Sequence, residues 1–192
     1  ETPDQNEPKP EENQKSFPGG EWSTILCNPD YALPAGYHET VKLAPVQGDY
    51  QMDYRAAPAM KAMIAAAKND GIDLLICSTY RTTAYQRQLY ENRINIVMGE
   101  DPSLSYDEAA EVAATINAVP GTSEHETGLA ADIVTPEYQR LNENFDQTDA
   151  YRWLKEHCKE YGFILRYPKE KTAITKIIYE PWHYRFVGTE HS

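Results

Sequence analysis

SEHETGLAAD, from Ser123 to Asp132, and EPWH, from Glu180 to His183, are the two most informative segments of this chain. The first contains a histidine and an aspartate seven residues apart, and the second contains a glutamate and a histidine three residues apart. Two histidines and one carboxylate are enough protein ligands for a catalytic zinc ion, with a fourth position open for water. The two segments together therefore predict a zinc site.

The predicted zinc ligands are His125, Asp132 and His183. The spacing between the first two is too long for consecutive turns of a helix, so we expect His125 on a loop and Asp132 on the strand that follows it. Gly128 between them permits a backbone conformation that other residues resist. The helical H-E-x-x-H zinc motif is excluded, because Leu129 occupies the position of its second histidine. Taken alone, this segment is also compatible with a loop histidine and an aspartate that caps a turn.

Glu180 is the candidate catalytic base that would remove a proton from water. Residues three apart on a regular strand face opposite sides, so the strand must end or bulge between Glu180 and His183 if both reach one site. Pro181 supplies that break because it cannot donate a hydrogen bond to a sheet. An ordinary strand end with exposed side chains is the alternative for this segment alone.

Arg81 and Gln86 are candidates for substrate contacts. Arg81 closely follows a predicted buried strand, where a guanidinium could stabilise a carbonyl oxygen that becomes an oxyanion, or bind a carboxylate. An ordinary surface arginine is the alternative. Gln86 could donate its amide to a substrate, or it could complete a helix capping box with Thr83, and these two roles compete.

The charge balance limits the classes of partner that the chain is expected to bind. It has 30 acidic and 18 basic residues, which gives a formal net charge of -12. Nucleic acids and anionic membranes are bound through patches of Lys and Arg, so this balance argues against both. The three cysteines show no C-x-x-C spacing, which argues against a zinc ribbon or a redox motif.

Residues 1–21 contain one large apolar side chain, Phe17, among many Pro, Glu, Asn and Gln residues. Such a segment cannot bury enough apolar surface to offset the entropy lost on ordering. We expect it to be a disordered, acidic, Pro-rich linker that tethers the protein to an upstream membrane anchor. We expect residues 22–192 to form one folded domain.

Hydrophobic periodicity and helix boundary signals predict an α+β fold. Helices are expected over residues 55–69, 82–98, 105–118 and 149–161. Strands are expected over residues 72–77, 129–134, 163–167, 174–180 and 184–187. The helices come mainly first and the strands mainly last, which differs from a regular βαβ alternation.

The spaced pattern S-x-H-x-x-G-x-A-x-D at residues 123–132, followed by E-P-W-H at residues 180–183, resembles the VanY-type D-alanyl-D-alanine carboxypeptidases of the peptidase M15 family. The segments Ser78–Arg81 and Tyr161–Pro168 fit the same family, and the resemblance covers about residues 26–188. Thr79 stands where family members commonly have glycine, which leaves every catalytic position in place.

The resemblance implies the fold shared by DD-peptidases and the hedgehog signalling domain, in which helices pack on a small, mainly antiparallel sheet that carries a zinc site. It implies that Zn²⁺ is the cofactor and that Glu180 is the catalytic base. It implies that Arg81 stabilises the oxyanion and that Ser123 and Gln86 help to bind the terminal carboxylate of the substrate. The metal ligands implied are His125, Asp132 and His183.

The implied reaction is hydrolysis of the last peptide bond of a peptidoglycan stem peptide that ends in D-Ala, by a monomeric enzyme on the cell-wall side of the membrane. An LD-carboxypeptidase acting on tetrapeptide stems would use the same site. A non-catalytic zinc-containing domain that binds cell wall is a rival from another class, although it would not need Glu180. A cross-bridge endopeptidase would need a cleft that is open at both ends.

Overall fold

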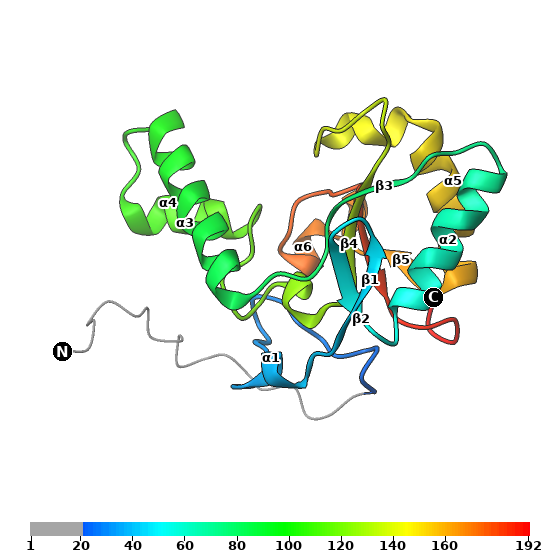
Figure 1. The fold of residues 1–192 in the computed structure, drawn as a ribbon. Coiled ribbons are helices and arrows are strands. Elements are labelled where there is room, and N and C mark those ends of the chain that lie inside the picture. Colours follow the sequence, from blue (N-terminus) through cyan, green and yellow to red (C-terminus); the bar gives the residue numbers. More distant parts are fainter. Residues whose placement is uncertain (1–20) are drawn as a thin grey trace.

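The computed structural model describes residues 21–192, so the predicted linker lies outside the described residues except for Glu21. The described strands are β1 (Leu43–Gln47), β2 (Tyr50–Asp53), β3 (Leu75–Ser78), β4 (Ala130–Val134), β5 (Phe163–Leu165) and β6 (His183–Phe186). The α-helices are α1 (Tyr37–Thr40), α2 (Ala57–Asn69), α3 (Thr83–Glu100), α4 (Tyr106–Ala114), α5 (Asp149–His157) and α6 (Thr172–Thr175). The 3-10 helices are η1 (Glu124–Thr127), η2 (Glu143–Gln147), η3 (Cys158–Tyr161) and η4 (Lys169–Lys171). Helices surround a small central sheet (Figure 1), which confirms the α+β prediction.

The central sheet has four antiparallel strands in the order β3-β4-β6-β5. Every residue of the two interior strands, β4 and β6, is buried. The register places Asp132 on β4 opposite His183 on β6, and Ser78 on β3 opposite Asp132. Strand pairing therefore brings together two of the predicted metal ligands.

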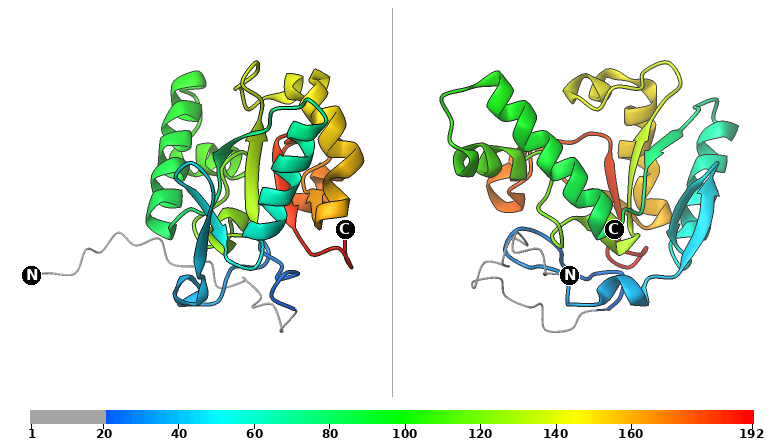
Figure 2. Two further views of the ribbon diagram at one scale, coloured as in Figure 1. Left: turned by 45° about the vertical axis from the view of Figure 1, so that its right-hand side comes forward. Right: turned by 60° about the vertical axis from the view of Figure 1, so that its left-hand side comes forward.

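Helices α2 and α5 lie side by side against the sheet (Figures 1 and 2). Met60 and Met63 on α2 are buried in the same apolar cluster as Trp153 and Leu154 on α5. These are the apolar positions that define the predicted helices. Full burial of a side chain of this size contributes roughly 1.5–3 kcal/mol relative to exposure, so this cluster is a major source of stability.

Helices α3 and α4 form a hairpin that stands apart from the α2 and α5 side of the molecule (Figure 2). The hairpin has its own apolar cluster, in which Ile94 and Val97 meet Ala109 and Ala113. Ser105 begins α4 with a capping box, in which its side chain and that of Glu108 each accept from the backbone N–H of the other residue. Helix α4 ends at Ala114, four residues before the predicted end.

The hairpin of β1 and β2 was not predicted. A Gly-Asp pair between two short strands is a hairpin signal that could have revealed it. Gly48 in this turn has a φ of +54°. The side chain of Gln47 accepts from the N–H of Ile76 at 2.7 Å and donates to the carbonyl of Leu74 at 3.0 Å. These two hydrogen bonds attach the hairpin to β3.

The predicted strand over residues 174–180 is wrong. This segment contains the end of α6, a left-handed residue at Lys176 with a φ of +64°, and an irregular path to β6. Both edges of β6 are already paired, with β4 on one side and β5 on the other, so a further strand cannot join there. Helix α5 also ends earlier than predicted, at His157, and continues as a 3-10 turn that stops at Gly162.

All three cysteines are free thiols, and Cys27 and Cys158 are buried. A membrane-spanning helix needs a long and strongly apolar sequence, and the helices found within residues 21–192 do not combine these properties.

Candidate metal centre

His125 reaches the sheet from a short 3-10 helix, η1, which ends at Gly128. Gly128 has a φ of +72°, and a Cβ atom there would lie 3.0 Å from the backbone nitrogen of Asp53. A larger residue would therefore meet both backbone strain and a steric contact. The predicted arrangement, with His125 before the glycine and Asp132 on the strand after it, agrees with the structure.

Glu180 lies on a turn that leads into β6, which corrects the expectation that it ends a strand. The N–H of His183 donates to the carbonyl of Glu180 at 3.1 Å, and Pro181 occupies the second position of this turn. Proline favours that position because its fixed φ suits the turn. The turn reverses the chain, so Glu180 Oε2 lies 3.7 Å from Nδ1 of His183.

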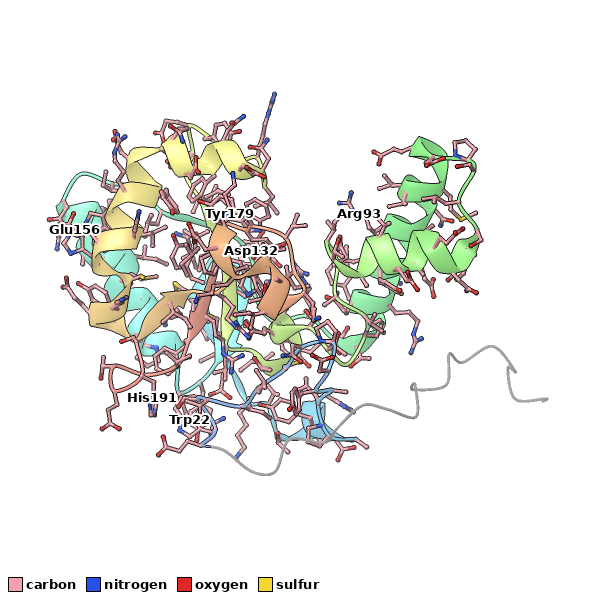
Figure 3. The ribbon with its side chains drawn as sticks, turned by 180° about the vertical axis from the view of Figure 1, so that it is seen from behind. Trp22, Arg93, Asp132, Glu156, Tyr179 and His191 are labelled. Carbon is pink, nitrogen blue, oxygen red and sulfur yellow. The ribbon has the colours of Figure 1, made fainter. Side chains whose placement is uncertain are left out.

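The three predicted ligands converge on one point. Nε2 of His125 lies 3.3 Å from Oδ2 of Asp132, and Nδ1 of His183 lies 3.1 Å from Oδ1 of the same carboxylate. One ligand atom from each residue lies within 4.8 Å of the other two. Atoms bonded at about 2 Å to a shared zinc ion lie within about 4 Å of one another, so a shift of about 1 Å would complete the site. Figure 3 shows Asp132 in the interior of the domain.

Each histidine is held through its second ring nitrogen. Nδ1 of His125 lies 2.7 Å from the carbonyl oxygen of Thr79, which can only accept, so this nitrogen carries the proton and leaves Nε2 free. Nε2 of His183 lies 3.4 Å from Oε2 of Glu124. Metal-binding histidines usually donate their second N–H in this way, so the donor set fits a metal ion.

Glu124 was missed in the sequence analysis. It is buried, and its Oε1 lies 2.7 Å from Nε of Arg166 and 3.0 Å from a terminal nitrogen of Arg185. Arg185 also donates to the backbone carbonyl of Ile25 at 2.8 Å. The two cations compensate the buried carboxylate, which in turn holds the ring of His183. The only local sign of this role is that Glu124 directly precedes His125 in the chain.

Arg81 lies beside the predicted ligands. One of its terminal nitrogens is 3.0 Å from Oδ2 of Asp132, and its Nε donates to the hydroxyl of Ser78 at 2.9 Å. The second terminal nitrogen donates to Oε1 of Gln86 at 3.3 Å. The guanidinium is thus oriented by three side chains at the rim of the candidate centre.

The predicted capping box of Thr83 and Gln86 is wrong. Thr82 caps α3 instead, and its side chain accepts from the N–H of Tyr85 at 3.2 Å. Gln86 is fully buried, and its amide nitrogen donates to the carbonyl of Ala118 at 2.7 Å. Its side chain therefore links Arg81 to the loop after α4.

Six of the seven predicted site residues line one cleft of about 310 Å³, and Gln86 lies behind it. The six are Arg81, Ser123, His125, Asp132, Glu180 and His183. A larger hollow of about 460 Å³ lies beside Tyr161 and Gly188 and contains none of them.

Burial, charge and hydrogen bonding shift the pKa values of four residues in the cleft. Burial alone would raise the pKa of Asp132, but the charge and hydrogen bonds of the two histidines hold it well below its usual value. Burial opposes charge on His183, yet hydrogen bonds to Asp132 and Glu124 raise its pKa to about 9. Burial, together with the charge of Arg81, lowers the pKa of His125 to about 4. Burial raises the pKa of Glu180 to about 8.

Comparison with known proteins identifies the family. The family model described as "VanY: D-alanyl-D-alanine carboxypeptidase" matches residues 49–189. The chain belongs to the VanY family. The matched range includes the whole candidate metal centre, and the resemblance found in the sequence is confirmed.

Two solved VanY structures resemble this VanY-family chain closely. VanYB in complex with D-alanine-D-alanine has a TM-score of 0.79 at 38% identity, covering 89% of this chain and 90% of that chain. A mutant of the VanY D,D-pentapeptidase from a VanB-type resistance cassette, in complex with Zn(II), has a TM-score of 0.76 at 38% identity, covering 88% and 90%. The predicted DD-peptidase-like fold is therefore confirmed.

Among curated proteins, a D-alanyl-D-alanine carboxypeptidase of Enterococcus faecalis is 38% identical to this VanY-family chain over 172 residues. The match covers 88% of the chain and 60% of the relative. The chain thus spans about three fifths of the length of that relative.

Proposed function

We propose that this chain is a zinc-dependent D-alanyl-D-alanine carboxypeptidase that removes the terminal D-Ala from peptidoglycan stem peptides. The observation that carries the proposal is the convergence of His125, Asp132 and His183, with ligand atoms within 4.8 Å of one another, in a cleft that Glu180 also lines. The VanY structures that contain Zn(II) and D-alanine-D-alanine support both the metal and the substrate.

His125, Asp132 and His183 would hold the zinc ion. Two imidazoles and one carboxylate form a donor set that zinc uses in catalytic sites. A bound zinc ion supplies Lewis acidity toward the scissile carbonyl and lowers the pKa of water toward about 7. The hydrogen bonds that the histidine rings donate to the Thr79 carbonyl and to Glu124 support this assignment, because they fix each ring in a ligating orientation.

Glu180 would act as the general base and then as the general acid. It takes a proton from the attacking water, whose oxygen forms a bond to the scissile carbonyl carbon. The C–N bond then breaks, and Glu180 passes the proton to the leaving amine of D-Ala. A side chain in this role typically contributes about 10²- to 10⁴-fold in rate.

Arg81 would share the negative charge that develops on the carbonyl oxygen. Its hydrogen bonds to Ser78 and Gln86 orient the guanidinium before substrate arrives. Gln86 is buried behind Arg81, so we assign it the role of positioning Arg81. The hydroxyl of Ser123, in the same cleft, would bind the terminal carboxylate of the substrate.

Peptidoglycan lies outside the cytoplasmic membrane, and we therefore propose that the enzyme acts on the cell-wall side. A single copy of the chain supplies every side chain in the proposed mechanism, which supports a monomeric enzyme. The net charge of -12 agrees with a substrate other than nucleic acid.

Mass spectrometry of purified muropeptides tests the proposed function. The protein is incubated with pentapeptide and with tetrapeptide stems, and the molecular masses of the products are measured. The expected result is loss of one D-Ala from the pentapeptide, with the tetrapeptide left intact. Shortening of the tetrapeptide alone would assign LD-carboxypeptidase activity instead, and binding without cleavage would assign a cell-wall-binding domain. Cleavage of cross-linked dimers alone would assign an endopeptidase.

Replacement of Glu124 by Gln is expected to destabilise the protein and weaken zinc binding. The variant leaves the buried Arg185 and the half-buried Arg166 without their shared carboxylate, and breaking a buried ion pair typically costs about 3–5 kcal/mol. It also weakens the contact that holds His183, and loss of such a contact typically costs about 10- to 100-fold in metal affinity. Urea unfolding and competition with a zinc indicator measure the two effects.

Glu126→Gln is the matched control for Glu124→Gln. Glu126 is also buried, but its Oε2 accepts from the N–H of Gly121 and its Oε1 has no hydrogen-bond partner among the described residues. This substitution should leave zinc affinity unchanged. Equal zinc affinities in the two variants would show that Glu124 does not support His183.

A further inference from the structure

One face of α3 lines the cleft beyond the metal centre. Tyr85, Leu89 and Arg93 recur every four residues, so they share one side of the helix, and all three border the cleft. Figure 3 shows Arg93 on the side of the α3–α4 hairpin that faces the body of the domain. Arg93 is therefore a cationic group in the same cleft as the proposed catalytic residues.

The charges within the cleft are unevenly distributed. Its acidic side chains are Glu124, Asp132 and Glu180, and all of them belong to the metal centre. Arg81 is paired with Asp132, whereas Arg93 forms no ion pair within residues 21–192. An arginine without a carboxylate partner, in a cleft of a strongly acidic chain, is suited to bind an anionic group of a ligand.

Arg93 is held in place by a neutral group. Its Nε donates to Oδ1 of Asn117 at 3.2 Å, and Asn117 also lines the cleft. This bond orients the guanidinium and leaves its terminal nitrogens available as donors. Because an amide does not neutralise the cation, the full charge remains for a ligand.

The position of Arg93 along α3 indicates which part of a peptide it would meet. Gln86, which bonds Arg81, lies seven residues before Arg93, which is about 10 Å along an α-helix and close to two full turns. An extended peptide advances about 3.3 Å per residue, so this distance spans about three residues. Because Arg81 would contact the scissile carbonyl, the residues two to three positions before the scissile bond would lie beside Arg93.

We propose that Arg93 binds a free carboxylate of the stem peptide, located two or three residues before the scissile bond. This inference rests on the proposed carboxypeptidase function. In a pentapeptide stem, the residue three positions before the terminal D-Ala is the γ-linked D-glutamate, whose α-carboxylate is free unless it is amidated. The next residue carries a second carboxylate when it is diaminopimelate. Arg93 would thus make the enzyme distinguish acidic stems from amidated ones.

The experiment compares peptides that differ in one functional group. One pair contains isoglutamate or isoglutamine at the second position, and a second pair contains diaminopimelate or its amide at the third. Wild-type protein is expected to show a kcat/KM about 10- to 100-fold higher for the acid than for the amide in one pair, mainly through KM. Arg93→Gln should abolish this preference. Arg93→Lys should retain part of it.

Arg87→Gln is the matched control, because Arg87 lies on the same helix and does not line the cleft. It removes the same charge and should leave the acid preference intact. A wild-type protein that treats acid and amide alike would overturn the proposal. An equal loss of kcat/KM on both peptides in Arg93→Gln would also overturn it, since that result indicates a purely structural role.

A binding measurement separates failure of this inference from failure of the proposed function. Calorimetry with Glu180→Ala and with the double variant Glu180→Ala/Arg93→Gln reports acid and amide binding without turnover. If wild-type protein cleaves neither peptide but Glu180→Ala binds the acid more tightly through Arg93, the carboxylate site stands and the proposed reaction fails. Equal binding of acid and amide, or no binding of either, would refute the site.

Discussion

Glu180→Gln is expected to lower the rate of D-Ala release by about 10²- to 10⁴-fold, because glutamine cannot take the proton of the attacking water. The substituted side chain has nearly the same size, and the three proposed zinc ligands are untouched. The variant should therefore retain its zinc and its fold. Release of D-Ala measured by chromatography, with zinc content measured by atomic absorption, gives both quantities on one sample.

Glu170→Gln is the control for this substitution, because Glu170 is exposed on η4 and does not line the cleft. It should leave activity and zinc content at wild-type values. Full turnover by the Glu180→Gln variant would contradict the assignment of the base. Loss of zinc from that variant would instead indicate that Glu180 supports the metal site.

Removal of the metal is expected to reduce activity to background and to lower the stability of the fold. A ligand that binds only the native state stabilises it by about 4 kcal/mol when its free concentration is 1,000 times Kd. In the stripped protein, the buried carboxylate of Asp132 keeps its ion pair with Arg81 but loses the charge of the metal ion. Dialysis against a chelator, followed by thermal unfolding and an activity assay, tests both effects, and added Zn²⁺ should restore both.

His125→Asn and His38→Asn provide matched variants for the metal experiment. His125 is a proposed ligand, and its loss should abolish stoichiometric zinc binding. His38 is exposed at α1, so its replacement should leave one zinc ion per chain. Activity that survives both chelation and His125→Asn would rule out a zinc mechanism at this centre.

The metal centre could be predicted because its signals are local. His125, Gly128 and Asp132 form one short motif, and the structure uses each as the spacing indicates, with Gly128 at a φ of +72°. Helix α2 was also predicted to within two residues, since its buried face repeats with helical periodicity. Helix α2 and each of the two short motifs of the centre are thus determined locally, although strand pairing is what brings His183 to Asp132.

Interactions between distant residues could not be predicted. Glu124 meets Arg166 and Arg185, which lie 42 and more positions further along the chain, and no periodicity connects them. Gln86 was expected to bind substrate or, as the competing role, to complete a capping box with Thr83, but its amide bonds Arg81 and Ala118. The apolar segment after α6 resembled a strand because sequence does not reveal that β6 has no free edge.

The two walls of the cleft obtain their rigidity from different sources. Strands β4 and β6, which carry two of the ligands, contribute Ile133 and Tyr184 to the large apolar cluster, whereas α3 and α4 are packed around the separate group of Ile94, Val97, Ala109 and Ala113. A change of volume in the smaller group would tilt the wall that carries Arg93 while the metal ligands keep their positions. The proposed acid preference would therefore be tunable through the smaller cluster, with Gln86 as the point where α3 also touches Arg81.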